Sequence, residues 1–155
     1  MPRMRGVEHL CHGASENGHE MIVKMLLTDI RTFLDSRDYS GWTPLSLAAS
    51  NGHEMIVKIL LDKNADIEAK DRHGQTPLSR AAENGHKMSV QILLKKNANI
   101  EAKDDNGQTP LSCAAKKGHE IIVKVLLEKN ANIEARDRFG QPLSLAASTQ
   151  RPSSV

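Results

Sequence analysis

The sequence contains few aromatic residues, only two cysteines and no long apolar run. Aromatic residues make up 3% of the 155 residues, so a core has to be assembled from aliphatic side chains and alanine. No stretch of about 18 consecutive apolar residues occurs, so no membrane span is predicted, and the first residues lack the apolar segment of a secretory signal. The formal net charge of +2 is too small to indicate a nucleic acid or an anionic membrane as partner.

A period of about 33 residues runs through the chain. The dipeptide Gly-His occurs at residues 18–19, 52–53, 85–86 and 118–119, and the tetrapeptide Thr-Pro-Leu-Ser at 43–46, 76–79 and 109–112. Such a period indicates a stack of similar units, each in contact with its neighbours, rather than a domain closed around one core. Proteins built in this way present an extended surface to another macromolecule.

Residues 41–73 show what one unit encodes. Thr43 and the proline after it predict the start of a helix, because threonine caps free backbone N–H groups and proline fits the first helical position. Gly52 predicts the end of that helix in the left-handed conformation. An apolar stripe then predicts a second helix that ends at Asn64. Both helices are too short to be stable alone, so their stability has to come from stacking.

The pattern Asp-x-x-Gly-x-Thr-Pro-Leu-x-x-Ala-Ala-x-x-Gly-His-x-x-x-Val-x-x-Leu-Leu resembles the ankyrin repeat, which forms a turn and two helices in about 33 residues. Residues 38–61, 71–94 and 104–127 match it closely, and the sequence of the units is similar to that of fungal ankyrin-repeat arrays. The resemblance implies an all-α solenoid of helix-turn-helix units with projecting turns, forming a single domain over residues 1–155. The expected units are a degenerate repeat at 7–37, repeats at 38–70, 71–103 and 104–136, a partial repeat at 137–150 and a tail at 151–155.

Histidines and lysines provide the alternatives to a protein-binding module. The histidine of each Gly-His pair recurs once per unit, at spacings of about 10 Å that rule out a shared metal ion, and we expect it to close the turn into the second helix. His9, Cys11 and His12 are close in sequence but lack a fourth ligand. The pairs Lys95-Lys96 and Lys116-Lys117 have acidic neighbours and no accompanying aromatic ladder. A metal- or nucleic-acid-binding regulator is therefore the less favoured alternative.

The two cysteines bear on the cellular compartment. Cys11 and Cys113 fall in the first and fourth units, which places them roughly 30 Å apart at about 10 Å per unit. A disulfide needs Cα atoms within about 7 Å, so the two thiols cannot pair in one chain. This fits a reducing environment, and we expect an intracellular protein, in the cytoplasm rather than the nucleus.

No catalytic motif stands outside the repeat pattern. The sequence lacks a nucleophile elbow, a phosphate-binding glycine loop and an isolated pair of acidic residues. We therefore expect no enzymatic activity, no catalytic residue, no metal and no cofactor. Four methionines, at positions 21, 25, 55 and 88, fall in predicted second helices, where we expect them to pack in the core.

Positions that differ between copies are those expected to carry recognition, because positions that stay constant build the scaffold. In ankyrin-repeat proteins the differing positions line the concave face and the projecting turns, and the resemblance implies that they contact a partner protein. The predicted contact residues are Tyr39, Ser40, Trp42, Ser50, Asn51, Arg72, His73, Gln75, Glu83, Asn84, Asp105, Asn106, Gln108, Lys116, Lys117, Arg138, Phe139 and Gln141. Tyr39, Trp42 and Phe139 resemble the aromatic anchors of protein interfaces.

The end of the pattern supports a second reading of the same fold. After Ala147 the repeat stops, and Gln150-Arg151-Pro152 stands where Gly-His-Glu is expected. The chain could therefore be a fragment of a longer array that serves as the sensor or targeting part of a multidomain protein. The short segment 142–148 does not cover the apolar residues of segment 121–127 as a full unit would, so we expect the chain to self-associate through this end.

Overall fold

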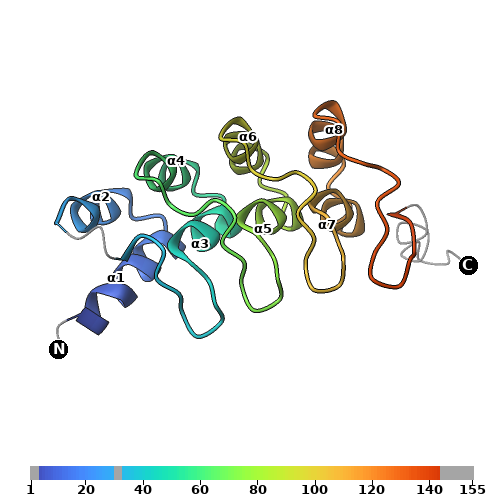
Figure 1. Ribbon diagram of the computed structural model, residues 1–155. Helices are drawn as coiled ribbons and strands as arrows, with labels where there is room; N and C mark the ends of the chain where they lie inside the picture. The colour runs from blue at the N-terminus through green and yellow to red at the C-terminus, as the bar shows by residue number, and fades with distance from the viewer. Residues whose placement is uncertain (1–3, 30–32, 144–155) are drawn as a thin grey trace, which may run out of the picture.

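The computed structural model describes residues 4–29 and 33–143, and these ranges contain eight α-helices and no strand. The helices form four antiparallel pairs stacked side by side into an elongated solenoid, with long turns projecting from one side (Figure 1). In chain order the helices are α1 (Met4–Glu16), α2 (Glu20–Asp29), α3 (Pro44–Asn51), α4 (Glu54–Asp62), α5 (Pro77–Glu83), α6 (Lys87–Lys95), α7 (Pro110–Lys117) and α8 (Glu120–Glu128). The all-α solenoid predicted from the sequence is confirmed.

The helix starts follow from the Thr-Pro pairs. Thr43 adopts an extended backbone before α3, and its Oγ1 accepts a hydrogen bond from the backbone N–H of Ser46 at 3.2 Å. Thr76 and Thr109 cap α5 and α7 in the same way. The first helices of the interior units therefore begin where the sequence predicts, because one hydroxyl satisfies an N–H group that lacks a partner within the helix.

Left-handed residues end the helices at the predicted places. Gly52 has φ 75° after α3. Asn64, Asn97 and Asn130 have φ between 64° and 67° after the second helices, and they are the non-glycine residues with positive φ in the described ranges. Asparagine tolerates this conformation better than other residues with a Cβ atom. The predicted role of these asparagines as helix terminators is confirmed.

The first helix differs from the expected degenerate unit. α1 begins at Met4, ahead of the predicted unit start at residue 7, and it contains 13 residues where α3 contains 8. Leu10 stands where the interior units have the helix-starting proline. Without proline, a residue that resists a preceding helical turn, the helix extends toward the N-terminus.

The core is a continuous ladder of aliphatic side chains. Leu60, Leu93 and Leu126 of the second helices have no exposed surface, and neither do Ala48 and Ala81 of the first helices. Small alanines let successive first helices approach closely, while the leucines fill the space between the two layers of helices. Each unit therefore completes its core only against its neighbours.

The histidines of the Gly-His pairs close the turn into the second helix as expected, for example through the backbone N–H of His53, which donates to Ala48 O at 2.9 Å. The rings of His53 and His119 also reach the preceding unit. His53 Nε2 lies 2.8 Å from the carbonyl oxygen of Glu16, one unit earlier, and His119 Nε2 lies 2.8 Å from that of Glu83. A Cβ atom added to Gly52 would lie 2.5 Å from the His86 ring. Gly52 therefore has two roles: it adopts the left-handed conformation of the turn, and its lack of a side chain leaves room for the His86 ring of the next unit.

This double role predicts unequal costs for one substitution at two glycines. Gly52→Ala should lower the free energy of unfolding by roughly 2 kcal/mol, since the left-handed strain is joined by a clash with His86. Gly118→Ala should cost only about 1 kcal/mol, because its Cβ would meet nothing within 4 Å among the described residues. Urea unfolding of the two variants measures the difference. Equal losses in the free energy of unfolding would show that the clash with the His86 ring does not contribute.

The expected burial of the methionines is wrong. The exposed fractions are 67% for Met21, 66% for Met25, 40% for Met55 and 49% for Met88. Met55 and Met88 directly precede positions that face the core, so Ile56 and Ser89 are buried while the two methionines point outward. A helix rotates by about 100° per residue, and that single step separates the two environments.

The residues that carry the predictions for the C-terminal end lie only partly within the described ranges. Val123 is half-buried, whereas the equivalent Val57 and Val90 are fully buried, and Ile121 is 60% exposed. Residues 144–155, which hold the second half of the predicted partial repeat 137–150 and the whole tail 151–155, lie outside the described residues. Self-association through this end stays a prediction.

Candidate protein-interaction surface

The projecting turns are held in one shape by aspartates. Asp38 Oδ1 accepts hydrogen bonds from the backbone N–H groups of Ser40 and Trp42, at 2.8 and 2.9 Å. Asp71, Asp104 and Asp137 do the same in the following turns, with the groups two and four residues ahead. Each turn is thus closed by a carboxylate within its own sequence, a standard use of aspartate.

Neighbouring turns are also bonded to one another. The backbone N–H of Arg72 donates to Ser40 O at 3.2 Å, that of Asp105 to His73 O at 3.1 Å, and that of Arg138 to Asn106 O at 2.8 Å. The turns therefore form one ordered edge along the molecule (Figure 1). A surface ordered in advance loses less conformational entropy when a partner binds.

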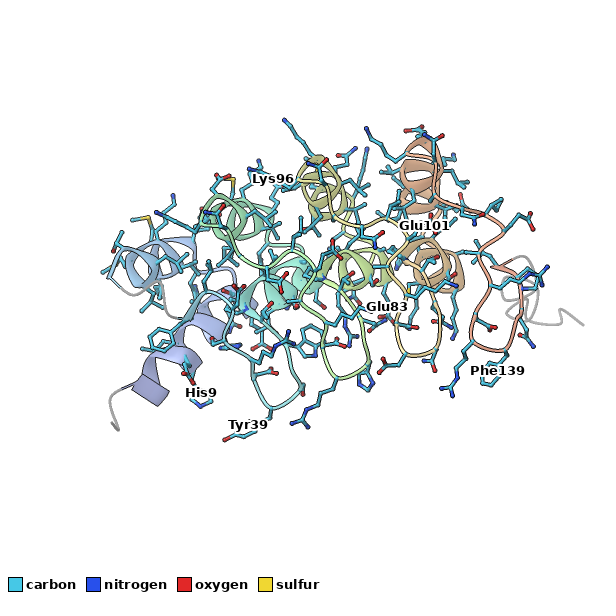
Figure 2. All side chains as sticks on the ribbon, viewed as in Figure 1. His9, Tyr39, Glu83, Lys96, Glu101 and Phe139 are labelled. Carbon is cyan, nitrogen blue, oxygen red and sulfur yellow. The ribbon has the colours of Figure 1, made fainter. Side chains whose placement is uncertain are left out.

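Two predicted aromatic residues lie at the tips of this edge. Tyr39 is 82% exposed in the turn before α3, and Phe139 is 75% exposed in the turn after α8 (Figure 2). The predicted residues Ser40, Arg72, His73, Asp105, Asn106 and Arg138 are exposed on the same turns. The Arg138 guanidinium lies 5.3 Å from the Phe139 ring centroid, so this tip combines a cation with an aromatic face.

Trp42 differs from these tips because it is half-buried. Its ring lies against the Arg80 guanidinium, 4.4 Å from the ring centroid. The indole also lines a hollow of about 350 Å³ on the concave side, together with Glu16, Asp38, Ser40, Leu47, Ser50 and Asn51. The structure therefore brings four predicted residues, Ser40, Trp42, Ser50 and Asn51, around one cavity, whose lining also includes the acidic residues Glu16 and Asp38 and the apolar residue Leu47.

Arg80 is the central residue that the sequence interpretation missed. Its Nε and Nη2 donate to Asp71 Oδ2 at 2.8 and 2.5 Å, and its Nη1 lies 3.5 Å from Glu83 Oε2. The Asp71 side chain has no exposed surface. A signal was available, because the position after Pro-Leu-Ser reads Leu47, Arg80 and Cys113 in successive copies.

Gln75 is the predicted contact residue that the structure places inside. It is 7% exposed, and its amide donates to Glu83 Oε2 at 3.1 Å and lies 3.9 Å from Cys113 Sγ. Glu83 of its own unit and Cys113 of the next unit therefore lie against its side chain. Gln108 is half-buried and Gln141 exposed at the same register.

The remaining predicted residues lie at the ends of the first helices. Asn84 Nδ2 donates to Ser50 Oγ of the preceding unit at 2.9 Å, and Lys117 Nζ lies 3.7 Å from Glu83 Oε1. Lys116 is exposed beside Lys117. The acceptors and cations of neighbouring units are thus paired along the concave face, and Glu83 is shared by Arg80, Gln75 and Lys117 (Figure 2).

The cluster at the start of the chain is not arranged as a metal centre. His9 is exposed, Cys11 is 1% exposed, and the His12 ring nitrogens lie 2.7 to 3.1 Å from the carbonyl oxygens of Glu8, Ser36 and Trp42. Within residues 4–29 and 33–143, no group of three histidine, cysteine or acidic side chains is placed to hold a metal ion. His12 instead ties α1 to the turn that carries Trp42.

Both thiols are held in their protonated form. Burial raises the pKa of Cys113 to about 12, and the negative charges of Asp104 and Glu83 add to the effect. Burial also raises the pKa of Cys11. The thiolate is the reactive species, so neither cysteine is set up as a nucleophile.

We therefore predict slow alkylation of both cysteines in the folded protein. Iodoacetamide at about pH 8 should label the cysteines of the folded protein far more slowly than those of the chain unfolded in guanidinium. Because the folded pKa of Cys113 lies above the ordinary value of 9.0, its contribution to stability is present below pH 9.0 and declines as pH rises toward 12. Mass spectrometry after timed labelling measures the rates, and equally fast labelling of folded and unfolded chains would contradict the prediction.

Comparison with known proteins addresses the family. No helix in the described part of the chain is long and apolar enough to cross a membrane. No curated protein matches the chain. A family model described as ankyrin repeats in three copies matches residues 10–104, 71–137 and 96–155. With the helix pairs, the projecting turns and these matches together, the chain belongs to the ankyrin-repeat family.

Proposed function

We propose that this chain is a non-catalytic module that binds a partner protein through its projecting turns and concave face. Ankyrin repeats are generally protein–protein interaction modules and typically non-catalytic scaffolds. The observation that carries the proposal is the ordered edge of bonded turns, which presents Tyr39 and Phe139 at its tips and leads to the hollow beside Trp42.

The chemistry of the hollow favours a particular contact. Leu47 and Trp42 supply apolar surface, while the carboxylates of Glu16 and Asp38 supply negative charge. A lysine or arginine of the partner fits this lining, because its methylene stem covers apolar surface and its charged end reaches a carboxylate. A second hollow of about 340 Å³ is lined by Glu8, His9, Arg37, Asp38, Tyr39 and Arg72, so Asp38 borders both hollows. We propose that a partner segment runs over the turn that holds Asp38 and contacts both hollows.

Capture of proteins from cells of the native source tests this proposal. Wild-type protein, Tyr39→Ala, Phe139→Ala and Trp42→Ala are compared as bait. Tyr39→Ala is the cleanest change, since an 82% exposed side chain contributes little to folding. We expect partners bound by the wild type to fall at least tenfold with this variant, as for an aromatic hot spot of about 2 kcal/mol.

The matched control carries two changes away from the turn edge, Lys63→Gln together with Lys129→Gln, at exposed positions just after α4 and α8, and should retain the same partners. Melting curves identify any variant that lost binding by unfolding, a particular concern for the half-buried Trp42. If the captured proteins are the same for the wild type and all three aromatic variants, the partner surface lies elsewhere.

A further inference from the structure

A row of exposed apolar side chains belongs to the outer helices α2, α4, α6 and α8. These helices form the layer that lies away from the projecting turns (Figure 1). The row consists of Met21, Met55, Met88 and Ile121, one residue from the first turn of each of α2, α4, α6 and α8. We name these four residues the outer apolar row. Their exposed fractions of 67%, 40%, 49% and 60% show that none packs in the core. Single exposed apolar residues are common, but here an exposed apolar residue recurs at the same register in four successive units.

A basic row runs beside the outer apolar row. Lys24, Lys58 and Lys124 stand three residues after Met21, Met55 and Ile121, one helical turn further along the same side. All three are exposed, and the ion pairs found among the described residues do not include them. Gln91 takes the position in the third unit. Positive charge therefore borders the apolar row on one flank.

The apolar row also borders a depression between units. A hollow of about 350 Å³ lies between the helix turns of the third and fourth units, lined by Gly85, Gly118, His119, Glu120, Ile121 and Ile122. The surface there is concave and partly apolar, so an inserted side chain loses water contact on several sides. Flexible methionine side chains adapt to such a partner at low steric cost.

The spacing of the units indicates the shape of the occupant. Neighbouring helices in a stack lie about 10 Å apart, and seven residues of an α-helix rise about 10.5 Å. One apolar residue per heptad of a crossing helix therefore meets one member of the outer apolar row. We infer that this row binds an amphipathic helix of a partner protein, about 22 residues long, with an acidic flank facing Lys24, Lys58 and Lys124.

A membrane surface fits these observations less well. Glu54 and Glu120 directly precede Met55 and Ile121, and Asp62 and Glu128 lie further along the same helices. An anionic lipid surface would be repelled by these carboxylates, and the row contains only one apolar residue per unit. A partner helix with charged residues on both flanks fits the mixture of lysines and carboxylates beside the row, because each charge can be matched by one side chain of the helix.

A synthetic peptide tests the inference directly. The probe is a fluorescein-labelled helical peptide of about four heptads, with leucine at two positions of every heptad and glutamate along one flank. Fluorescence anisotropy should show saturable binding to the wild-type protein. Met55→Gln with Met88→Gln should weaken it at least tenfold, because these neutral and helix-compatible changes remove apolar contact from two exposed positions.

Two further variants separate this inference from the proposed function. Lys58→Glu with Lys124→Glu should weaken the glutamate peptide and strengthen a matched peptide with lysine in place of glutamate. Tyr39→Ala should leave peptide binding unchanged, since it lies on the turn edge. The inference is overturned if the glutamate peptide does not bind, or if it binds all variants equally. It is also overturned if the methionine pair governs flotation with phosphatidylserine vesicles instead of peptide binding.

Discussion

Arg80→Leu is expected to lower the free energy of unfolding by about 3 kcal/mol, near the lower end of the cost of breaking a buried ion pair. The change leaves the Asp71 carboxylate without its cation, although this side chain has no exposed surface. Asp71 still accepts hydrogen bonds from the backbone N–H groups of His73 and Gln75, which limits the loss of stability. Leucine is the residue at the equivalent position of the preceding unit, so its size suits the fold.

The control for this change is a second substitution at the partner residue. Asp71→Asn in the Arg80→Leu background removes the isolated charge and retains a side-chain oxygen for the turn, so most of the lost stability should return. Urea unfolding of the single and double variants gives the coupling between the two residues. If Arg80→Leu alone leaves stability unchanged, the ion pair does not hold this part of the concave face together.

The change also tests the surface itself. Arg80 covers one side of the Trp42 ring at 4.4 Å, so its loss frees the indole beside the hollow. We expect Arg80→Leu to weaken partner capture even at temperatures where the protein is folded. Circular dichroism on the same samples separates a local rearrangement of Trp42 from unfolding.

Leu93→Ala is expected to lower the free energy of unfolding by about 3 to 4 kcal/mol, as for other fully buried leucines. Leu93 lies in an interior unit that contacts a neighbour on each side. In a linear array, stability is approximately a sum of unit and interface contributions. Weakening the middle should therefore separate the unfolding of the two halves as well as reduce stability.

The comparison is Leu126→Ala in the pair α7–α8, the last helix pair within the described residues. Leu126 is also fully buried, but a change there should loosen one end and leave the other units folded. Chemical unfolding followed by circular dichroism and by Trp42 fluorescence distinguishes the two cases, because Trp42 reports only on the first half. Coincident transitions in the Leu93→Ala variant would show that the array unfolds as one cooperative block.

The sequence by itself determined the unit and its local geometry. Thr43 caps its helix and Asn64 ends the next with positive φ, as predicted, because both roles depend on atoms within a few residues. The period of about 33 residues implied stacking, since helices this short are unstable alone. The family and the all-α architecture followed from the same local pattern, repeated.

Only the tertiary structure decided which side chains meet across units. Trp42 and Arg80 belong to different repeats, and nothing local to either predicts their contact. Gln75 is buried because residues from its own unit and the next close around it, and Met55 is exposed because the outer helices turn that position away from the core. Such contacts depend on the rotation and spacing of stacked units, which a repeat pattern does not specify. The concave face, which we propose binds a partner, depends on these contacts.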